Sequence, residues 1–331
     1  MNILITGYAG FIAKHVTTKL CEMGERPMLG ADCFEPRVHR SIALGTSPEA
    51  RRCAEIPGWL LAEADVIVHL AAQVGVADSM ETPLRYMYDN TLDTARFLAN
   101  LTFRVKEMSS ARPLRRLVVA SSMSVYGDPV TSMPIDEDWP VRPASVYGLT
   151  KYDQERLCLL WGAQHDVSVV ALRYFNVYGP GQALHNPYTG VLANFTNAYL
   201  HDEAPQVYED GEQTRDFIYV DDVAVATALA ATHLRALGGV YNIATGQPTS
   251  ILRAANALGQ VLGAQRAPIV TGTRRIGDIR HCIGNSERFA LAYDWHPRWP
   301  FALGIKEYAA WLSSTYGTAP HESGVSCVPT R

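Results

Sequence analysis

The chain has 331 residues and a formal net charge of −4 without a basic block, which predicts one large two-lobed unit or two domains and argues against a dedicated nucleic-acid surface. No apolar run is long enough to cross a bilayer, which argues against a membrane protein. The six cysteines are scattered without a CxxC pair, a pattern that indicates reduced thiols in a cytoplasmic protein and no metal site.

The first half of the chain alternates short apolar runs with helical patterns. The runs are rich in Val, Ile and Leu on both faces, which is typical of buried parallel strands. Because the first run begins at residue 2, we expect no signal peptide. This alternation predicts an α/β fold with a doubly wound parallel sheet. The predicted strands are 2–6, 27–32, 66–71, 116–121 and 167–173, and the predicted helices between them include 11–23, 83–101 and 147–164.

The texture of the sequence changes after residue 173. The stretch NVYGPGQALHNPYTG is rich in Gly, Pro and Asn and predicts a long ordered loop. A helix over 191–200 follows, and the rest mixes helices with irregular pieces. We therefore predict a larger domain over 1–173 plus about 216–245, a smaller lobe over about 174–215 and 246–317, and a loose tail over 318–331.

The stretch TGYAGFIA joins the first predicted strand to the first predicted helix. Gly7 and Gly10 let a backbone turn approach a pyrophosphate closely, and the following helix N-terminus presents free N–H groups. Ala13 stands where a third glycine is expected in a dinucleotide-binding fingerprint. A glycine turn in any βαβ unit is the alternative interpretation of this motif alone.

Asp32 ends the second predicted strand. A carboxylate at this position accepts hydrogen bonds from a ribose diol and repels a 2′-phosphate. Asp32 therefore favours NAD over NADP, whereas the nearby Arg37 and Arg40 keep NADP open as an alternative.

Tyr147 and Lys151 lie one helical turn apart in YGLTK. An ammonium group beside a phenol favours the phenolate and lowers its pKa. Ser121, Ser122 and Ser124 follow a predicted strand, and strand carboxyl ends line the ligand crevice of such sheets. An exposed Tyr–Lys pair is the alternative interpretation, but the glycine turn, the aspartate and the serine run together make it improbable.

The chain resembles the extended short-chain dehydrogenase/reductases, specifically the NAD-dependent nucleotide-sugar epimerases and dehydratases, from residue 1 to about residue 311. The resemblance implies a Rossmann doubly wound parallel sheet with a smaller α/β substrate-binding lobe, and NAD as cofactor. The motifs that carry it occur in the family's order: TGYAGFI, VIVHLAAQ, SSMSVYGD, YGLTK, RYFNVYGPGQ, RDFIYVDDVA, YNIATG and RRIGDIRH.

The resemblance also implies roles for individual residues. Ser122, rather than Ser124, is the catalytic serine, Tyr147 is the acid/base, and Lys151 is its pKa partner and ribose anchor. The stretch before Asp65 is shorter than in the family, and Glu55 is the candidate replacement for an aspartate that the family places near the adenine. The implied cofactor-binding residues are Gly7, Ala9, Gly10, Phe11, Ile12, Asp32, Leu70, Ala71, Ala72, Gln73, Tyr147, Lys151 and Tyr174, with His69 and Phe175 beside them.

The predicted smaller lobe holds the nucleotide diphosphate in this family. By resemblance, Arg215 and Arg275 pair with phosphates, for which a planar guanidinium suits bidentate contacts, and Asp278 contacts the nucleotide ribose. For the two arginines, the alternative interpretation is a solvated position on the surface. For Tyr208, which lies in the segment that meets the base, the alternative is a half-buried aromatic side chain on a strand. The implied substrate-binding residues are Val74, Ser122, Met123, Ser124, Tyr147, Asn176, Val191, Tyr208, Arg215, Arg275 and Asp278.

The reaction follows from the residues after the catalytic serine. The family's shared step is oxidation at C4 of the sugar, and 4,6-dehydratases carry an acidic pair where this chain has Met123 and Ser124. Neither side chain is a general acid at neutral pH, so dehydration is disfavoured. A 4-epimerase needs no further acid or base, and its NAD is regenerated and stays bound.

We therefore predict an NAD-dependent isomerase that inverts C4 of a UDP- or dTDP-linked hexose through a 4-keto intermediate. The segment GPGQALHNPYTGVL resembles dTDP-rhamnose-type more than UDP-galactose-type 4-epimerases. The alternatives are an NAD(P)H-dependent 4-ketosugar reductase, a dehydratase or decarboxylase, and a non-catalytic NAD-binding sensor. By resemblance, the chain forms a homodimer through helices 83–101 and 147–164. The sugar, the base and the direction of flux stay open.

Overall fold

The structure is a computed structural model that describes residues 1–32, 52–107, 113–129, 133–184, 190–233, 238–274 and 279–317. Within these ranges, six parallel strands form one sheet in the order β2-β1-β3-β4-β5-β9. This confirms the predicted doubly wound sheet, and the order reverses between β1 and β3, where such folds bind ligands. The strands are β1 (Asn2–Thr6), β2 (Arg26–Ala31), β3 (Val66–His69), β4 (Arg116–Ser122), β5 (Ser168–Tyr174) and β9 (Gly239–Ile243).

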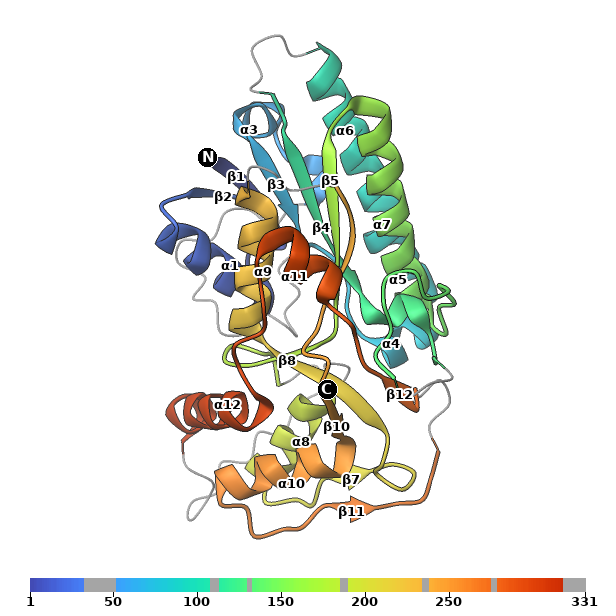
Figure 1. Cartoon of the computed structure of the whole chain (residues 1–331), viewed down its shortest axis with the longest axis vertical. Coiled ribbons are helices and arrows are strands. Elements are labelled where there is room, and N and C mark those ends of the chain that lie inside the picture. Colours follow the sequence, from blue (N-terminus) through green and yellow to red (C-terminus); the bar gives the residue numbers. More distant parts are fainter. Residues whose placement is uncertain are drawn as a thin grey trace, which may run out of the picture.

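Helices cover both faces of this sheet (Figure 1). On one face α1 (Phe11–Glu22) packs against α9 (Val220–Thr232), and on the other α6 (Asp93–Glu107) packs against α7 (Val146–His165). The side chains of each strand alternate between the two faces. In β1, Ile3 and Ile5 join the core beneath α1 and α9, whereas Leu4 joins the core beneath α6 and α7.

The predicted helix over 83–101 is interrupted and ends later than expected. It begins as α5 (Pro83–Tyr86), passes through a π-helical segment (Met87–Leu92) and continues as α6 to Glu107. The wider π turn presents Asp89 and Asn90 to the loop after β3. The backbone N–H of Gln73 donates to Asn90 Oδ1 at 2.7 Å, and its side chain donates to Asp89 Oδ2 at 3.1 Å. These hydrogen bonds form only when the loop after β3 and the π-helical segment come together in the folded chain. The spacing of apolar residues in the sequence does not reveal them.

The smaller lobe lies below the large sheet in Figure 1. Its main sheet has the order β10-β8-β12, with β6 also paired to β8, and a second pair joins β7 to β11. The strands are β6 (Asn176–Tyr178), β7 (Gln206–Val207), β8 (Thr214–Tyr219), β10 (Pro248–Ser250), β11 (Ile269–Val270) and β12 (His281–Cys282), and the helices are α8 (Val191–Leu200), α10 (Ile251–Leu262) and α12 (Phe301–Tyr316).

Several shorter elements complete the fold. Helix α11 (Glu287–Tyr293) packs on β9, and Phe289 and Tyr293 join the core of the large sheet. The predicted smaller lobe therefore contributes this helix to the larger domain. None of the described helices combines the length and apolar character that a membrane span requires. The remaining elements are η1 (Cys53–Glu55), α3 (Gly58–Glu63), α4 (Val76–Glu81) and η3 (Met123–Tyr126).

Asp216 in β8 ties the smaller lobe to the end of the large sheet. Its carboxylate is buried and accepts hydrogen bonds from the backbone and hydroxyl of Thr245, at 2.9 and 2.6 Å, and from the N–H groups of Gly246 and Gly284, at 2.8 and 3.2 Å. Thr245 and Gly246 follow β9, so one side chain joins the two sheets. Burial raises the pKa of this carboxyl, while its hydrogen bonds favour the ionised form.

A second buried carboxylate holds helix α7 against the large sheet. Glu155 accepts hydrogen bonds from Ser121 Oγ in β4 at 2.7 Å and from Arg173 in β5, through Nε at 3.0 Å and Nη2 at 2.7 Å. Both partners of this ion pair are almost fully buried. The guanidinium group also donates to the phenol of Tyr126 and to the carbonyl of Glu137. The bidentate geometry and the satisfied donors are what a buried ion pair requires.

We predict that Glu155→Gln lowers the free energy of unfolding by about 3–5 kcal/mol, because the Arg173 guanidinium then stays buried without its counter-charge. Urea denaturation followed by circular dichroism measures this loss. Asp153→Asn is the matched control on the same helix, because an amide oxygen can still accept from Thr91 as the carboxylate does, and it should change stability by less than about 0.5 kcal/mol. Equal stability of the two variants would contradict the role assigned to the pair.

Candidate active site

The turn after β1 brings bare backbone to the head of α1. Gly7 has φ +68°, and a Cβ there would lie 2.8 Å from the backbone nitrogen of Ala71, so a side chain would push the two loops apart. No side chain caps the first turn of α1, which starts after Gly10. Its N–H groups therefore face the cavity as a ready anion site. Ala13 is buried in the core beneath this helix.

A cavity of about 440 Å³ extends from this turn along the carboxyl ends of the strands. Asp32 lies at its wall, and its carboxylate accepts a hydrogen bond from the backbone N–H of Ala9 at 2.9 Å. Ala9 itself is buried behind this contact and does not line the cavity. The other predicted cofactor residues do line it: Gly7, Gly10, Phe11, Ile12, Asp32, Leu70, Ala71, Ala72, Gln73, Tyr147, Lys151 and Tyr174.

The prediction for Glu55 is not supported. This side chain is exposed, does not line the cavity, and accepts a hydrogen bond from the backbone of Arg52 at 2.7 Å within its own short helix. Arg52 and Cys53 line the cavity instead. The Arg52 guanidinium donates to Asp89 and lies over the ring of Tyr88, 4.7 Å from its centroid. These partners come from the π-helical segment, so the sequence spacing around residue 52 could not reveal them.

Ser122 and Tyr147 both line this cavity and share a hydrogen bond. Ser122 ends β4, and its Oγ lies 3.2 Å from Ser124 Oγ. Ser145 caps α7 by accepting from the backbone of Gly148 at 3.0 Å, so the helix starts at Val146, one residue before Tyr147. A hydrogen bond from Ser122 lowers the pKa of Tyr147, but burial of the phenol raises it by more, so the net direction is upward.

Lys151 lies one turn further along α7 and is 3% exposed. Its ammonium donates to Gln154 Oε1 at 2.6 Å. Burial lowers the pKa of Lys151 to about 7, against the opposing effects of Cys158 and Glu155. The sequence predicts that Lys151 lowers the pKa of Tyr147. In the structure burial and Ser122 dominate that pKa, and the direct partner of Lys151 is an amide that the sequence analysis did not single out.

A second cavity of about 1180 Å³ lies in the smaller lobe. It adjoins the first cavity at Val76, Met123, Ser124 and Asn176, which line both. Six of the predicted substrate residues line this cavity: Met123, Ser124, Asn176, Val191, Tyr208 and Arg215. Val74, Ser122 and Tyr147 line the first cavity instead. Arg275 and Asp278 lie outside the described residues.

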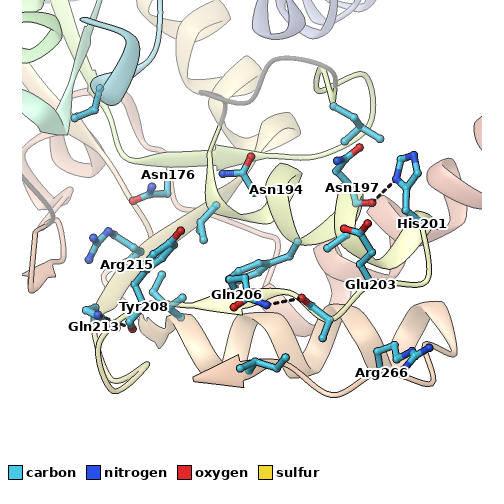
Figure 2. A pocket seen from close by; sticks show the side chains of 18 of the residues that line it. Asn176, Asn194, Asn197, His201, Glu203, Gln206, Tyr208, Gln213, Arg215 and Arg266 are labelled. Atoms are coloured by element: carbon cyan, nitrogen blue, oxygen red, sulfur yellow. Dashed lines mark hydrogen bonds between the residues drawn. The ribbon is translucent and has the colours of Figure 1, made fainter. Parts of the chain in front are cut away.

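Figure 2 shows Arg215, Tyr208 and Gln213 grouped at one end of the larger cavity. The Arg215 side chain is 8% exposed, and Nη1 donates to the carbonyl of Thr214 at 2.9 Å. Gln213 donates to the carbonyl of Tyr208 at 3.0 Å. Two buried acceptors, Gln213 Oε1 and Asn176 Oδ1, have no hydrogen-bond partner among the residues that the structure describes. Buried polar atoms of this kind are satisfied when a polar ligand supplies the donor.

Sequence reasoning missed the polar residues of α8 and the histidine that follows its last residue. Asn194, Asn197 and His201 line the cavity together with Val191. Asn197 and His201 lie at the end of the cavity away from Arg215 in Figure 2. The spacing of these four residues, by three, three and four positions, places them on one helical face. A periodicity analysis of residues 191–201 for polar as well as apolar positions could have found them.

The comparisons with known proteins agree with this geometry. The sequence profile of the NAD dependent epimerase/dehydratase family matches residues 3–244. The chain is 32% identical to a dTDP-L-rhamnose 4-epimerase of Burkholderia thailandensis, over 94% of this chain and 95% of that protein. It is 30% identical to a putative UDP-glucose 4-epimerase of Methanocaldococcus jannaschii, over 96% and 100%.

Solved structures show the same relationship. A UDP-glucose 4-epimerase of Thermotoga maritima with UDP-glucose superimposes with a TM-score of 0.84 at 28% identity, over 96% of this chain and all of that one. A UDP-glucose 4-epimerase of Thermus thermophilus in complex with NAD gives 0.80 at 27% identity, over 95% of this chain and all of that one. With its fold, glycine turn and Ser–Tyr–Lys set, the chain belongs to the NAD dependent epimerase/dehydratase family.

Proposed function

We propose that the protein is an NAD-dependent nucleotide-sugar 4-epimerase. The observation that carries this proposal is the junction of the two cavities at Met123, Ser124 and Asn176. A dinucleotide in the smaller cavity and a nucleotide sugar in the larger one would meet where Ser122 and Tyr147 lie. Relatives over nearly the whole chain are named as UDP-glucose and dTDP-L-rhamnose 4-epimerases.

The residues of the smaller cavity fit NAD. The bare backbone at Gly7 and the uncapped N-terminus of α1 suit a pyrophosphate. The buried carboxylate of Asp32, held by Ala9, suits a ribose diol and repels a 2′-phosphate. Lys151 would donate to the second ribose. NAD, when bound, supplies a reversible hydride acceptor for C4 of the sugar.

Tyr147 and Ser122 handle the proton. The phenolate of Tyr147 takes the proton of the C4 hydroxyl and returns it after the sugar has turned, while the hydroxyl of Ser122 donates to the same oxygen. The Ser122 hydrogen bond favours the phenolate against the larger, opposing effect of burial on the pKa of Tyr147, and Lys151 adds a positive charge on the same helix. C4 of the 4-keto intermediate is planar, so return of the hydride to the opposite face of C4 inverts its configuration.

Epimerisation fits the cavity junction better than dehydration. Met123 and Ser124 line the junction in place of an acidic pair. Asp78 also lines the smaller cavity, but its carboxylate accepts a hydrogen bond from the buried phenol of Tyr86 at 3.0 Å. A 4-ketosugar reductase would use the same Ser122 and Tyr147 but would release its cofactor at each turnover.

The larger cavity would hold the nucleotide diphosphate. Arg215 supplies a positive charge near the junction, and Asn176 and Gln213 supply buried acceptors for hydroxyl or N–H donors. Arg275 and Asp278 stay proposals from the sequence. The relatives are named for both UDP- and dTDP-sugars, so the base and the sugar are matters for assay, and a cytoplasmic location stays a prediction.

The outer surface of the helix pair would form a homodimer. Leu92 at the end of the π-helical segment and Leu160 in α7 are 40% and 61% exposed. Apolar side chains at helical spacing on neighbouring helices favour burial against a second copy.

The direct test of the activity is proton NMR in D₂O with UDP-glucose, UDP-glucuronate and dTDP-6-deoxyhexoses in turn, without added cofactor. We expect conversion to the C4 epimer with the C4 hydrogen retained. A new C6 methyl signal with deuterium at C5 would instead establish dehydration, and turnover only with added NADPH or NADH and a 4-ketosugar would establish the reductase.

We predict that Tyr147→Phe lowers the epimerisation rate by at least 100-fold, because the acid/base is removed, while bound NAD, measured by enzymatic assay of the denatured supernatant, stays within about twofold. An unchanged epimerisation rate would show that Tyr147 is not the acid/base, and absence of any turnover in the unaltered protein would instead favour the non-catalytic NAD sensor.

We predict that Asp32→Asn weakens NAD binding and lowers the ratio of NAD to NADP affinity by at least about tenfold, because the repulsion of a 2′-phosphate is lost. Calorimetric titration of protein stripped of its nucleotide measures both affinities. Glu55→Gln is the control, since that exposed carboxylate lies outside the cavity, and it should change neither affinity. An unchanged ratio for Asp32→Asn would show that the ribose lies elsewhere.

We predict that the double variant Leu92→Glu, Leu160→Glu sediments as a monomer of 36.4 kDa, whereas the unaltered protein sediments at about twice this mass, because buried charges oppose the interface. Leu291→Glu, on α11 and 82% exposed, is the control and should stay dimeric. A monomeric unaltered protein would contradict the proposed dimer.

A further inference from the structure

The ammonium group of Lys151 is held from inside the protein. Lys151 is 3% exposed and Gln154 is fully buried, although both lie on α7 beside the cofactor cavity. The distance from Nζ to Gln154 Oε1 is 2.6 Å. A buried ammonium needs acceptors to offset its lost hydration, and this amide oxygen is such an acceptor within the helix itself.

The orientation of the Gln154 amide follows from its other contacts. Its Nε2 lies 3.3 Å from the carbonyl oxygen of Ala71 and 2.8 Å from Thr94 Oγ1. A backbone carbonyl only accepts hydrogen bonds, so the NH₂ group must face Ala71. The amide oxygen therefore has to face Lys151, and a flipped amide would place two donors together.

His69 completes the support of this amide. One ring nitrogen lies 2.8 Å from Thr6 Oγ1, and the other faces Thr94 at 3.2 Å and Gln154 at 3.3 Å. The ring stacks on Phe97 with centroids 5.2 Å apart. Burial lowers the pKa of His69 to about 3, so the imidazole is neutral at working pH. Neutral groups thus connect the ammonium on α7 to strands β1 and β3.

The charged and titratable groups described around Lys151 are either paired with other groups or neutral, so the Gln154 amide is its direct partner. On its own helix, Glu155 is engaged by Arg173 from β5, and burial raises the pKa of the Cys158 thiol to about 12. From β3, His69 is neutral, and Tyr147 lies one turn earlier on α7. Gln154 therefore holds the ammonium without neutralising it.

We propose that Gln154 is a positioning residue for Lys151. The amide of Gln154 holds the ammonium group at the wall of the cofactor cavity and keeps it charged there. The positioning of Lys151 by Gln154 is inferred from the geometry alone. Its consequence for cofactor retention rests on the proposed function.

The experiment follows the ionisation of Lys151 directly. The chain has five lysines, namely Lys14, Lys19, Lys106, Lys151 and Lys306, so lysine labelled with ¹³C at Cε gives five resolvable signals, and Lys151→Met identifies the signal of interest. The signal is titrated in the unaltered protein, in Gln154→Met and in Gln154→Glu, which have similar length, and in the control Asp153→Asn. Bound NAD is measured in each preparation.

We expect Lys151 to titrate near pH 7 in the unaltered protein. In Gln154→Met the ammonium loses its acceptor, so its pKa falls by about one unit and bound NAD decreases at least threefold at pH 7.5. In Gln154→Glu a carboxylate faces the ammonium, so its pKa rises by about one unit. Asp153→Asn should leave the midpoint and bound NAD unchanged.

Opposite shifts in two variants of similar length separate positioning from simple loosening. If the substitutions merely loosened the helix, water would reach Lys151 and both variants would titrate higher, toward 10.5. That result, or an unchanged midpoint in Gln154→Met, would overturn the proposal. If the unaltered protein binds no NAD and converts no nucleotide sugar, the proposed function fails, and the titration still decides the role of Gln154.

Discussion

The buried pair of Glu155 and Arg173 is the constraint on which the active site depends. The reacting groups come from two elements, since Ser122 ends β4 while Tyr147 and Lys151 lie on α7. Packing of apolar side chains alone does not fix the position of a helix along a sheet, because it is not directional. A carboxylate that accepts from Ser121 in β4 and from both Nε and Nη2 of Arg173 in β5 removes this freedom. The serine next to Ser121 is thereby fixed relative to the helix that carries the phenol.

A second carboxylate does the same for the two lobes. Asp216 joins β8 to the segment after β9 through Thr245 and Gly246, and β8 also carries Arg215. The end of the larger cavity that contains Arg215 is therefore positioned relative to the large sheet. Together with the pairing of β6 with β8, this link connects the smaller lobe to the end of the large sheet where the two cavities adjoin.

Much of the fold and of the cofactor site could be predicted from the sequence, because these features are local. Apolar runs of four to seven residues report strands directly, and the glycine turn, Asp32 and the Tyr147–Lys151 spacing are read within one or two elements. The π-helical segment, Arg52 and Gln154 could not be predicted this way, since their roles depend on partners far along the chain. Glu55 shows the same limit, because neither its hydrogen bond to the backbone of Arg52 nor its position outside the cavity can be read from the sequence.

The residues that line the cavity of the smaller lobe were less predictable from the sequence for a related reason. Its cavity is built from one face of α8, the short strand β7 and the start of β8, and their side chains converge only after the lobe has folded. Tyr208 and Arg215 were predicted from flanking motifs, whereas Asn194 and Gln213 carry no local motif of their own.

A double-label crossover tests the central claim that one sugar gives up its hydride and takes the same hydride back inside a single site. Equal amounts of a nucleotide sugar deuterated at C4 and of the same sugar uniformly labelled with ¹³C are converted together, and the epimers are analysed by mass spectrometry. We predict that deuterium stays with the ¹²C product. Epimers that carry both deuterium and ¹³C, or deuterium recovered in added NAD, would contradict the account.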